Sequence, residues 1–213
     1  HVSLGNILFS RNDLDGAIDC YRQGLRVNPG DAETLYNLGV ACKAKGDLEG
    51  AIAAYRQVTS LKPDHAGAFF NLGAALRTKG DLDSAIVAYR EAVRLQPGNA
   101  GFLFSFGAAL KAKGDLEGAI FAYRGAIALR PDHAGTHASL GVALYARGDP
   151  EGAIASYRQA LQFQPEDAAT HYNLGVALKD KGDADGAIAE YRQAVRIKPD
   201  LAGGHYNLGV LLR

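Results

Sequence analysis

Aspartate recurs at a fixed interval along the chain and is the first residue type to consider for acid–base or metal chemistry. It returns every 34 residues within stretches such as GDLEGAIAAY at 46–55. The six copies are Asp13, Asp47, Asp81, Asp115, Asp149 and Asp183. A carboxylate at the start of a helix accepts hydrogen bonds from the free N–H groups of the first turn, and this role accounts for all six. We therefore predict that these aspartates cap helices and do not catalyse a reaction.

Histidine is the other candidate for chemistry. His137, His171 and His205 share one place in the 34-residue period. Successive stacked units would set them about a helix diameter apart or more, which is too far for one metal ion. His133 lies four residues before His137 but falls in the turn before the helix. Because no phosphate-binding glycine loop, nucleophile elbow or carboxylate pair accompanies them, we predict no catalytic residue, no cofactor and no metal site.

Composition excludes several classes of protein. The 213 residues hold 23 Lys and Arg against 23 Asp and Glu, and this balance argues against a nucleic-acid or anionic-membrane binder. No stretch approaches the run of roughly 18 apolar residues that a membrane helix needs. Cys20 and Cys42 lack the spacing of a zinc site, so we expect two buried apolar side chains. A soluble protein is expected, and its compartment stays open, with the cytoplasm slightly favoured.

Two helices per period would position all these residues. Apolar spacing predicts a first helix over 34–45. It ends with a cation in its last turn, which suits the negative end of the helix dipole. Gly46 then supplies a left-handed residue that closes this helix. A second helix follows Asp47 and ends before Pro63.

The period also predicts the domain organisation. Complete repeats span 32–65, 66–99, 100–133, 134–167 and 168–201, with partial repeats at 1–31 and 202–213. No linker or change in composition interrupts the series, so we predict a single domain over 1–213. A helix pair of this size cannot bury its own apolar faces, and neighbouring pairs must stack into a continuous core.

The second repeat shows the signature that identifies a family. Leu38-Gly39, Ala51, Tyr55 and Pro63 hold the order and spacing of the tetratricopeptide repeat, and they recur at 34-residue steps. The chain resembles that family across its whole length. The resemblance implies an all-α, right-handed α-α superhelical solenoid of helix–turn–helix repeats. It also implies a non-catalytic scaffold whose first helices line a concave groove that binds a protein or peptide.

The residues expected to face that groove form two rows. At the sixth position of each repeat stand Asn37, Asn71, Asn173 and Asn207, with Ser105 and Ser139. Asparagine is unfavourable inside helices, and its amide both donates and accepts, which suits the backbone of an extended peptide. Asparagine ladders of this kind are a feature of the family, notably in O-GlcNAc transferases. At the twelfth position stand Lys43, Arg77, Lys111 and Lys179, which would favour an acidic ligand.

Each row has an alternative explanation. Repeat duplication could leave solvated asparagines on an unused face, and cations near the end of a helix need no ligand. The aromatic residues at the fifth position, such as Tyr36 and Phe70, are expected to pack between adjacent first helices. A chaperone-type carboxylate clamp would need Lys at that position, and the first copy has Val2. We therefore do not expect that clamp.

Three functions stay open. The first is a scaffold that holds an extended, acidic segment of a partner protein. The second is the substrate-recognition arm of a larger, O-GlcNAc-transferase-like enzyme, because the chain begins at His1 without Met and we expect a piece of a longer protein. The third is a homo-oligomeric module that stacks end to end through Leu211 and Leu212.

Overall fold

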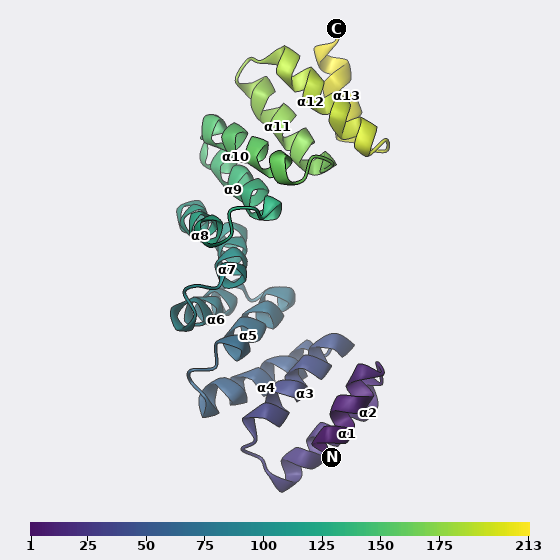
Figure 1. Cartoon of the computed structure of the whole chain (residues 1–213), viewed down its shortest axis with the longest axis vertical. Coiled ribbons are helices and arrows are strands. Elements are labelled where there is room, and N and C mark those ends of the chain that lie inside the picture. The colour runs from purple at the N-terminus through teal and green to yellow at the C-terminus, as the bar shows by residue number, and fades with distance from the viewer. The chain divides into compact units, whose positions relative to one another are not determined.

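Thirteen α-helices and no strand make up the computed structural model, which describes residues 1–213 (Figure 1). The expected all-α fold class is therefore confirmed. The helices are α1 (Val2–Ser10), α2 (Leu14–Val27), α3 (Ala32–Lys45), α4 (Leu48–Leu61), α5 (Ala66–Lys79), α6 (Leu82–Leu95), α7 (Ala100–Lys113), α8 (Leu116–Leu129), α9 (Ala134–Arg147), α10 (Pro150–Phe163), α11 (Ala168–Asp180), α12 (Ala184–Ile197) and α13 (Ala202–Leu211). The odd-numbered helices are the first helices of the repeats, and the even-numbered helices are the second.

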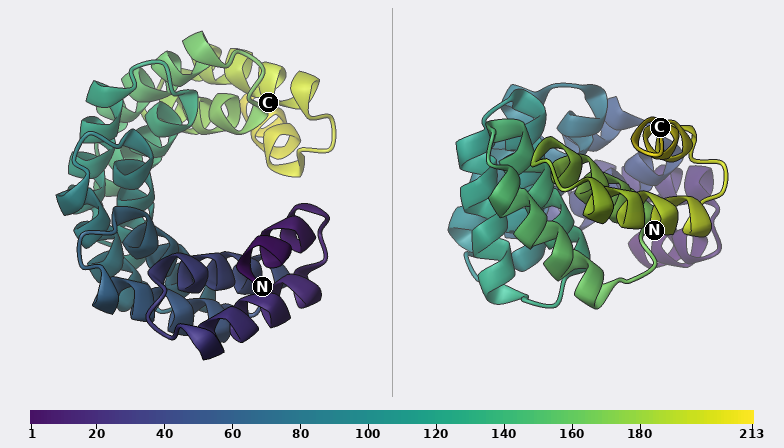
Figure 2. Two further views of the ribbon diagram at one scale, coloured as in Figure 1. Left: turned by 60° about the horizontal axis from the view of Figure 1, so that its bottom comes forward. Right: turned by 90° about the horizontal axis from the view of Figure 1, so that it is seen from above.

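The chain forms two compact units, an N-terminal unit of residues 1–109 and a C-terminal unit of residues 110–213. In the N-terminal unit α3 packs against α4 and α5 against α6, while α9 packs against α10 and α11 against α12 in the C-terminal unit. First helices of neighbouring repeats also touch, α1 with α3 and α9 with α11. The helix pairs follow one another as stacked layers within each unit (Figure 2).

The turn inside each repeat has the predicted chemistry. Gly46 ends α3 with a φ of 87°, in the left-handed region where a side chain would be strained. Asp47 then caps α4, and its carboxylate accepts a hydrogen bond of 2.9 Å from the backbone N–H of Gly50. Pro150 occupies the first turn of α10, where its missing N–H costs nothing.

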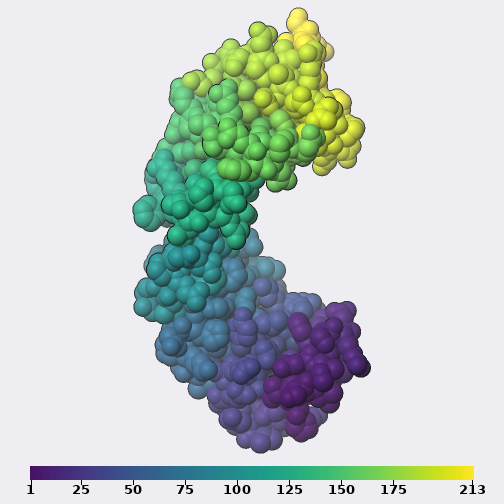
Figure 3. Space-filling view, in the orientation of Figure 1, coloured from purple at the N-terminus to yellow at the C-terminus, as the bar shows by residue number.

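A glycine in the first helix and a tyrosine in the second make the close contact of each pair. A Cβ atom placed on Gly39 would lie 2.6 Å from Cε1 of Tyr55, which is 0% exposed. The equivalent pairs are Gly5 with Tyr21, Gly73 with Tyr89, Gly141 with Tyr157 and Gly175 with Tyr191. Within each unit the side chains close over the space between paired helices (Figure 3). The glycine of the signature is therefore needed to make room for the buried ring.

A second set of caps begins the first helices, and the sequence pattern did not indicate it. The side chains of Asp31, His65 and His133 accept hydrogen bonds from backbone N–H groups of α3, α5 and α9. Asn99 does the same for the N–H of Gly101 at 3.0 Å. Each of these residues ends the turn that follows a proline, so both turns of the repeat are fixed by a side chain.

None of the helices combines the length and the apolar character that crossing a lipid bilayer requires. No group of three or more His, Cys, Asp or Glu side chains is placed to hold a metal ion. Cys20 and Cys42 are buried and unpaired, as expected.

Candidate functional site

The asparagines at the sixth position are half-buried, and two of them bond to a tyrosine of the preceding repeat. The amide nitrogen of Asn71 donates to the hydroxyl oxygen of Tyr36 at 2.8 Å. Asn207 donates to Tyr172 in the same way at 3.3 Å. These bonds leave one N–H and the carbonyl oxygen of each amide available. Part of what the sequence suggested as ligand-binding capacity therefore joins repeats together.

Asn37 belongs to a different arrangement at the first helices of the N-terminal unit. Its amide nitrogen donates to Oδ1 of Asn6 at 3.3 Å, and the hydroxyl group of Tyr21 donates to the same oxygen at 2.8 Å. Because Oδ1 of Asn6 accepts from both groups, its NH₂ group stays available, together with the carbonyl oxygen of Asn37. A pocket of about 330 Å³ opens beside these amides and is lined by Asn6, Phe9, Tyr21, Glu33, Asn37 and Val40.

Asn173, Ser105 and Ser139 complete the row and are half-buried. Asn173 makes no hydrogen bond to another side chain, because the residue 35 positions before it is Ala138 and not a tyrosine. Its whole amide is therefore available. The structure places every residue of this row on a first helix, as predicted, and whether the row contacts a ligand stays a prediction.

The basic row is on the surface of the first helices. Lys43 and Arg77 are exposed, whereas Lys111 and Lys179 are half-buried. Arg77 lies beside the buried Tyr89: burial raises the pKa of the Tyr89 hydroxyl, and the guanidinium partly opposes this. The preference for acidic ligands that we expect from this row likewise stays a prediction.

The cations that end the first helices have partners that the sequence pattern did not reveal. Lys45 pairs with Asp15, and Lys79 pairs with Glu49 at 2.6 Å. In the C-terminal unit Arg147 contacts Glu117 at 3.3 Å, and Lys181 pairs with Glu151. The acidic residue lies 30 positions earlier, in the second helix of the preceding repeat. A comparison of residues 30 positions apart in the sequence would have found these ion pairs, because an acidic residue stands 30 positions before each of these cations.

Three of the fifth-position aromatics are half-buried and pack on neighbouring rings, as expected: Tyr36, Phe70 and Tyr172. Tyr206, at the same position, is 73% exposed. The rings of Tyr36 and His65 stack with centroids 5.0 Å apart, and Phe70 stacks on Phe102 at 4.7 Å. Tyr36 also meets the ring of Tyr55 at 5.9 Å. The first two contacts connect a first helix to the beginning of the next first helix, and the third joins the two helices of one repeat.

The three co-registered histidines have a structural role. Nε2 of His137 lies 2.8 Å from the carbonyl oxygen of Pro131. The same contact joins His171 to Pro165 at 2.9 Å and His205 to Pro199 at 2.8 Å. A carbonyl oxygen only accepts, so Nε2 carries a proton and donates it. Each histidine therefore fixes the turn that precedes its helix.

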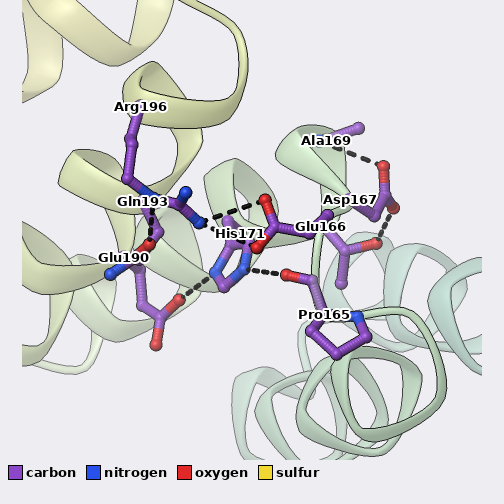
Figure 4. A network of polar contacts seen from close by, with 9 residues as sticks. Pro165, Glu166, Asp167, Ala169, His171, Glu190, Gln193 and Arg196 are labelled. Carbon is purple, nitrogen blue, oxygen red and sulfur yellow. Dashed lines mark hydrogen bonds and ion pairs between the residues drawn. The ribbon is translucent and has the colours of Figure 1, made fainter.

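His171 has a second contact, which links α11 to α12. Its Nδ1 lies 2.6 Å from a carboxylate oxygen of Glu190 (Figure 4). In the same view, Nη2 of Arg196 donates to Oε1 of Glu166 at 2.9 Å. This bond connects α12 to the turn between α10 and α11. The three carboxylates of this network each have a protein partner: Glu190 has His171, Glu166 has Arg196, and Asp167 accepts from the N–H of Ala169.

Two family models match the chain. One is described as "TPR repeat" and matches residues 5–46, 107–148, 143–182 and 177–212. The other is described as "Tetratricopeptide repeat" and matches residues 44–100. No curated protein matches the chain significantly.

Several solved structures are similar to the chain over most of their length. MamA is 27% identical with a TM-score of 0.74, and the match covers 78% of this chain and 96% of that one. YrrB, described as "a TPR protein with an unusual peptide-binding site", is 21% identical with a TM-score of 0.79 and coverage of 89% and 98%. Pseudomonas aeruginosa PilF is 18% identical with a TM-score of 0.78 and coverage of 98% and 95%. These neighbours share the all-α superhelical repeat fold.

Proposed function

Because the chain belongs to the tetratricopeptide repeat family, we propose that it is a non-catalytic scaffold that holds an extended segment of a partner protein against its first helices. The fold is compatible with this role, since YrrB has the same fold and is described as having a peptide-binding site. The partner is a protein or peptide and not a nucleic acid, in line with the balanced charge.

The observation that carries the proposal is the pocket beside Asn6 and Asn37. Tyr21 and Asn37 both donate to Oδ1 of Asn6, which fixes the Asn6 amide with its NH₂ group available. The donors of Asn6 and the acceptor of Asn37 match the C=O and N–H groups of an extended peptide. Fixing these amides before binding reduces the entropy that a ligand must overcome.

Asn173 extends the same function to the C-terminal unit. Its amide makes no hydrogen bond within the chain, and Ser139 and Lys179 lie on the same or the neighbouring first helix. Lys179, six residues after Asn173 on α11, would favour a carboxylate on the ligand, so we expect the segment bound there to be acidic. Asn71 and Asn207 contribute only their remaining N–H and carbonyl oxygen, since Tyr36 and Tyr172 occupy the other donor.

The test is a displayed-peptide selection on the unmodified protein, followed by titration of the selected peptides against two variants. Asn173→Ala removes an amide that makes no hydrogen bond within the chain. Any loss of affinity in this variant therefore comes from the lost contact with the ligand. Asn37→Ala removes the acceptor beside the Asn6 pocket. Each truncation is expected to weaken binding at its own unit by about tenfold, as for the loss of one or two hydrogen bonds.

Gln162→Ala is the matched control, because Gln162 is an exposed amide on a second helix, α10. It should leave all affinities unchanged. If the selected peptides bind both asparagine variants as tightly as they bind the parent protein, the amides do not hold the ligand and the proposed mechanism is wrong. Peptides without an acidic preference would remove the role given to Lys179.

A further inference from the structure

The outward face of α8 differs from that of every other second helix. Phe121 is 80% exposed there, and Gly125 and Ala128 lie one and two turns further along the same face. At the place of Gly125 the other second helices carry an amide or a carboxylate: Gln23, Gln57, Glu91, Gln159 and Gln193. The equivalents of Ala128 are Arg26, Ser60, Arg94, Gln162 and Arg196. Only in α8 does an exposed aromatic ring lie beside small residues.

This combination is unfavourable for an isolated chain. An exposed phenylalanine leaves a large apolar surface in water, and a glycine inside a helix raises the entropy lost on folding. Two such residues at i and i+4 on one helix face lie next to each other. Large exposed apolar residues rimmed by polar groups mark interaction sites. Small residues beside the ring let another helix approach closely.

The charges around Phe121 show which partner this face suits. Glu117 lies four residues before Phe121 and Arg124 three residues after it, so both stand on the same flank of the helix. Arg124 is exposed and forms no ion pair. The side chain of Glu117 contacts Arg147 of its own chain at 3.3 Å and is still 74% exposed, so it can also meet a second copy. When two copies of α8 pack antiparallel about a two-fold axis through Phe121, Arg124 of each copy faces Glu117 of the other.

We propose that α8 is the contact between two copies of this chain, with the two Phe121 rings at the centre and two reciprocal Arg124–Glu117 pairs beside them. A two-fold contact of this kind uses the same patch on both copies and closes at a dimer. It lies on a second helix, so it goes beyond the binding function proposed for the first helices and does not depend on it. The other second helices also carry an acidic residue at the place of Glu117 and an arginine at the place of Arg124. Only α8 has the apolar centre between them, so we expect the contact at α8 alone.

Sedimentation velocity over a range of concentrations tests the contact. The parent protein is expected to show a reversible monomer–dimer equilibrium with no larger species. Phe121→Glu should weaken dimerisation by about tenfold or more, as for a charge placed at the centre of an interface. Val87→Glu is the matched control, since Val87 holds the same place on α6 and is 59% exposed. It should leave the equilibrium unchanged.

A charge exchange separates the interface from damage to the fold. Arg124→Glu alone places Glu opposite Glu117 of the second copy, and Glu117→Arg alone places Arg opposite Arg124, so each variant should be monomeric. An equimolar mixture of the two variants restores both opposite-charge pairs and should form a heterodimer. A parent protein that stays monomeric at all concentrations would overturn the proposal. So would a mixture that associates no more than either variant alone.

Discussion

The amide nitrogen of Asn71 in α5 donates a hydrogen bond of 2.8 Å to the hydroxyl oxygen of Tyr36 in α3. The two residues are 35 positions apart and tie one first helix to the next. The same offset joins Asn207 to Tyr172. Where the fifth position is phenylalanine, as at Phe70, the residue 35 positions later is a serine, Ser105. At this offset, the fifth-position tyrosines Tyr36 and Tyr172 are followed by asparagine, and the fifth-position phenylalanines by serine.

We predict that Tyr36→Phe lowers the free energy of unfolding by about 0.5–1.5 kcal/mol, the usual net value of one such hydrogen bond. The double variant Tyr36→Phe/Asn71→Ser reproduces the natural phenylalanine–serine combination and should lose less than the sum of the single changes. Chemical denaturation of all four proteins measures the coupling. Tyr206→Phe is the control, because Tyr206 is 73% exposed. Additive effects at Tyr36 and Asn71 would contradict the coupling.

Gly39→Ala should destabilise the protein by about 1–3 kcal/mol, because the added Cβ would lie 2.6 Å from the ring of Tyr55 and overpack the helix pair. Gly67→Ala is the matched change in α5, where the nearest side-chain atom would be at 3.4 Å. It should be neutral or stabilising by about 0.4–1 kcal/mol, since alanine restricts the unfolded chain. The midpoints of thermal unfolding compare the two. Equal midpoints would show that Gly39 does not make the close contact.

The ion pair between Lys181 and Glu151 predicts a pH dependence. The hydrogen bond from Lys181 lowers the pKa of Glu151 below its ordinary value. A carboxyl group with a lower pKa in the folded state stabilises the protein above its unfolded pKa, and that stability is lost as the pH falls through the folded pKa. Lys181→Gln should therefore return the pKa of Glu151 toward its ordinary value. An NMR titration of the Glu151 carboxyl carbon that is identical in parent and variant would disprove this.

The hydroxyl group of Tyr145 should lose its proton at a higher pH than that of an ordinary tyrosine. The hydrogen bond that it donates to Asp180 raises the pKa of Tyr145 to about 12. A tyrosine with a raised folded pKa stabilises the protein below its unfolded pKa of about 10, and this contribution is lost as the pH rises from there through the folded value. Asp180→Asn should lower the pKa of Tyr145 toward 10, as measured with ring-labelled tyrosine. Tyr21 is the internal control, since burial is the main cause of its raised pKa and Asp180 does not contribute to it. No change at Tyr145 would remove Asp180 as the cause.

The parts of the fold that depend on local chemistry could be predicted from the sequence. Gly46 takes a positive φ, Asp47 caps α4 and Pro63 follows the end of that helix, as expected. Each of these roles is set by a residue and its immediate neighbours in the chain. The family signature also marked Gly39 and Tyr55, and the structure shows that the two are in contact.

The contacts between repeats could not be predicted in the same way. Lys45 lies in the last turn of α3, where a cation suits the helix dipole as expected, and it also pairs with Asp15 in the preceding repeat. We assigned the amide of Asn71 to a ligand, but Tyr36 accepts one of its hydrogen bonds. In both cases the partner lies about 30 residues away, and only the stacking geometry brings it within reach. Asn6 was not among the predicted site residues, and its link to Tyr21 became visible only once the helix pair was in place.

The constant offsets of the ion pairs and hydrogen bonds have a consequence for how such a chain can change its length. Removing residues 134–167, one whole period, would leave Lys181 at 30 positions after Glu117, where Arg147 stands now. The opposite-charge pair would form again with a new member. Insertion of a period would likewise supply each side chain with an equivalent neighbour. The ion pairs between repeats can therefore survive duplication and loss without any compensating substitution, provided that the change is a whole period.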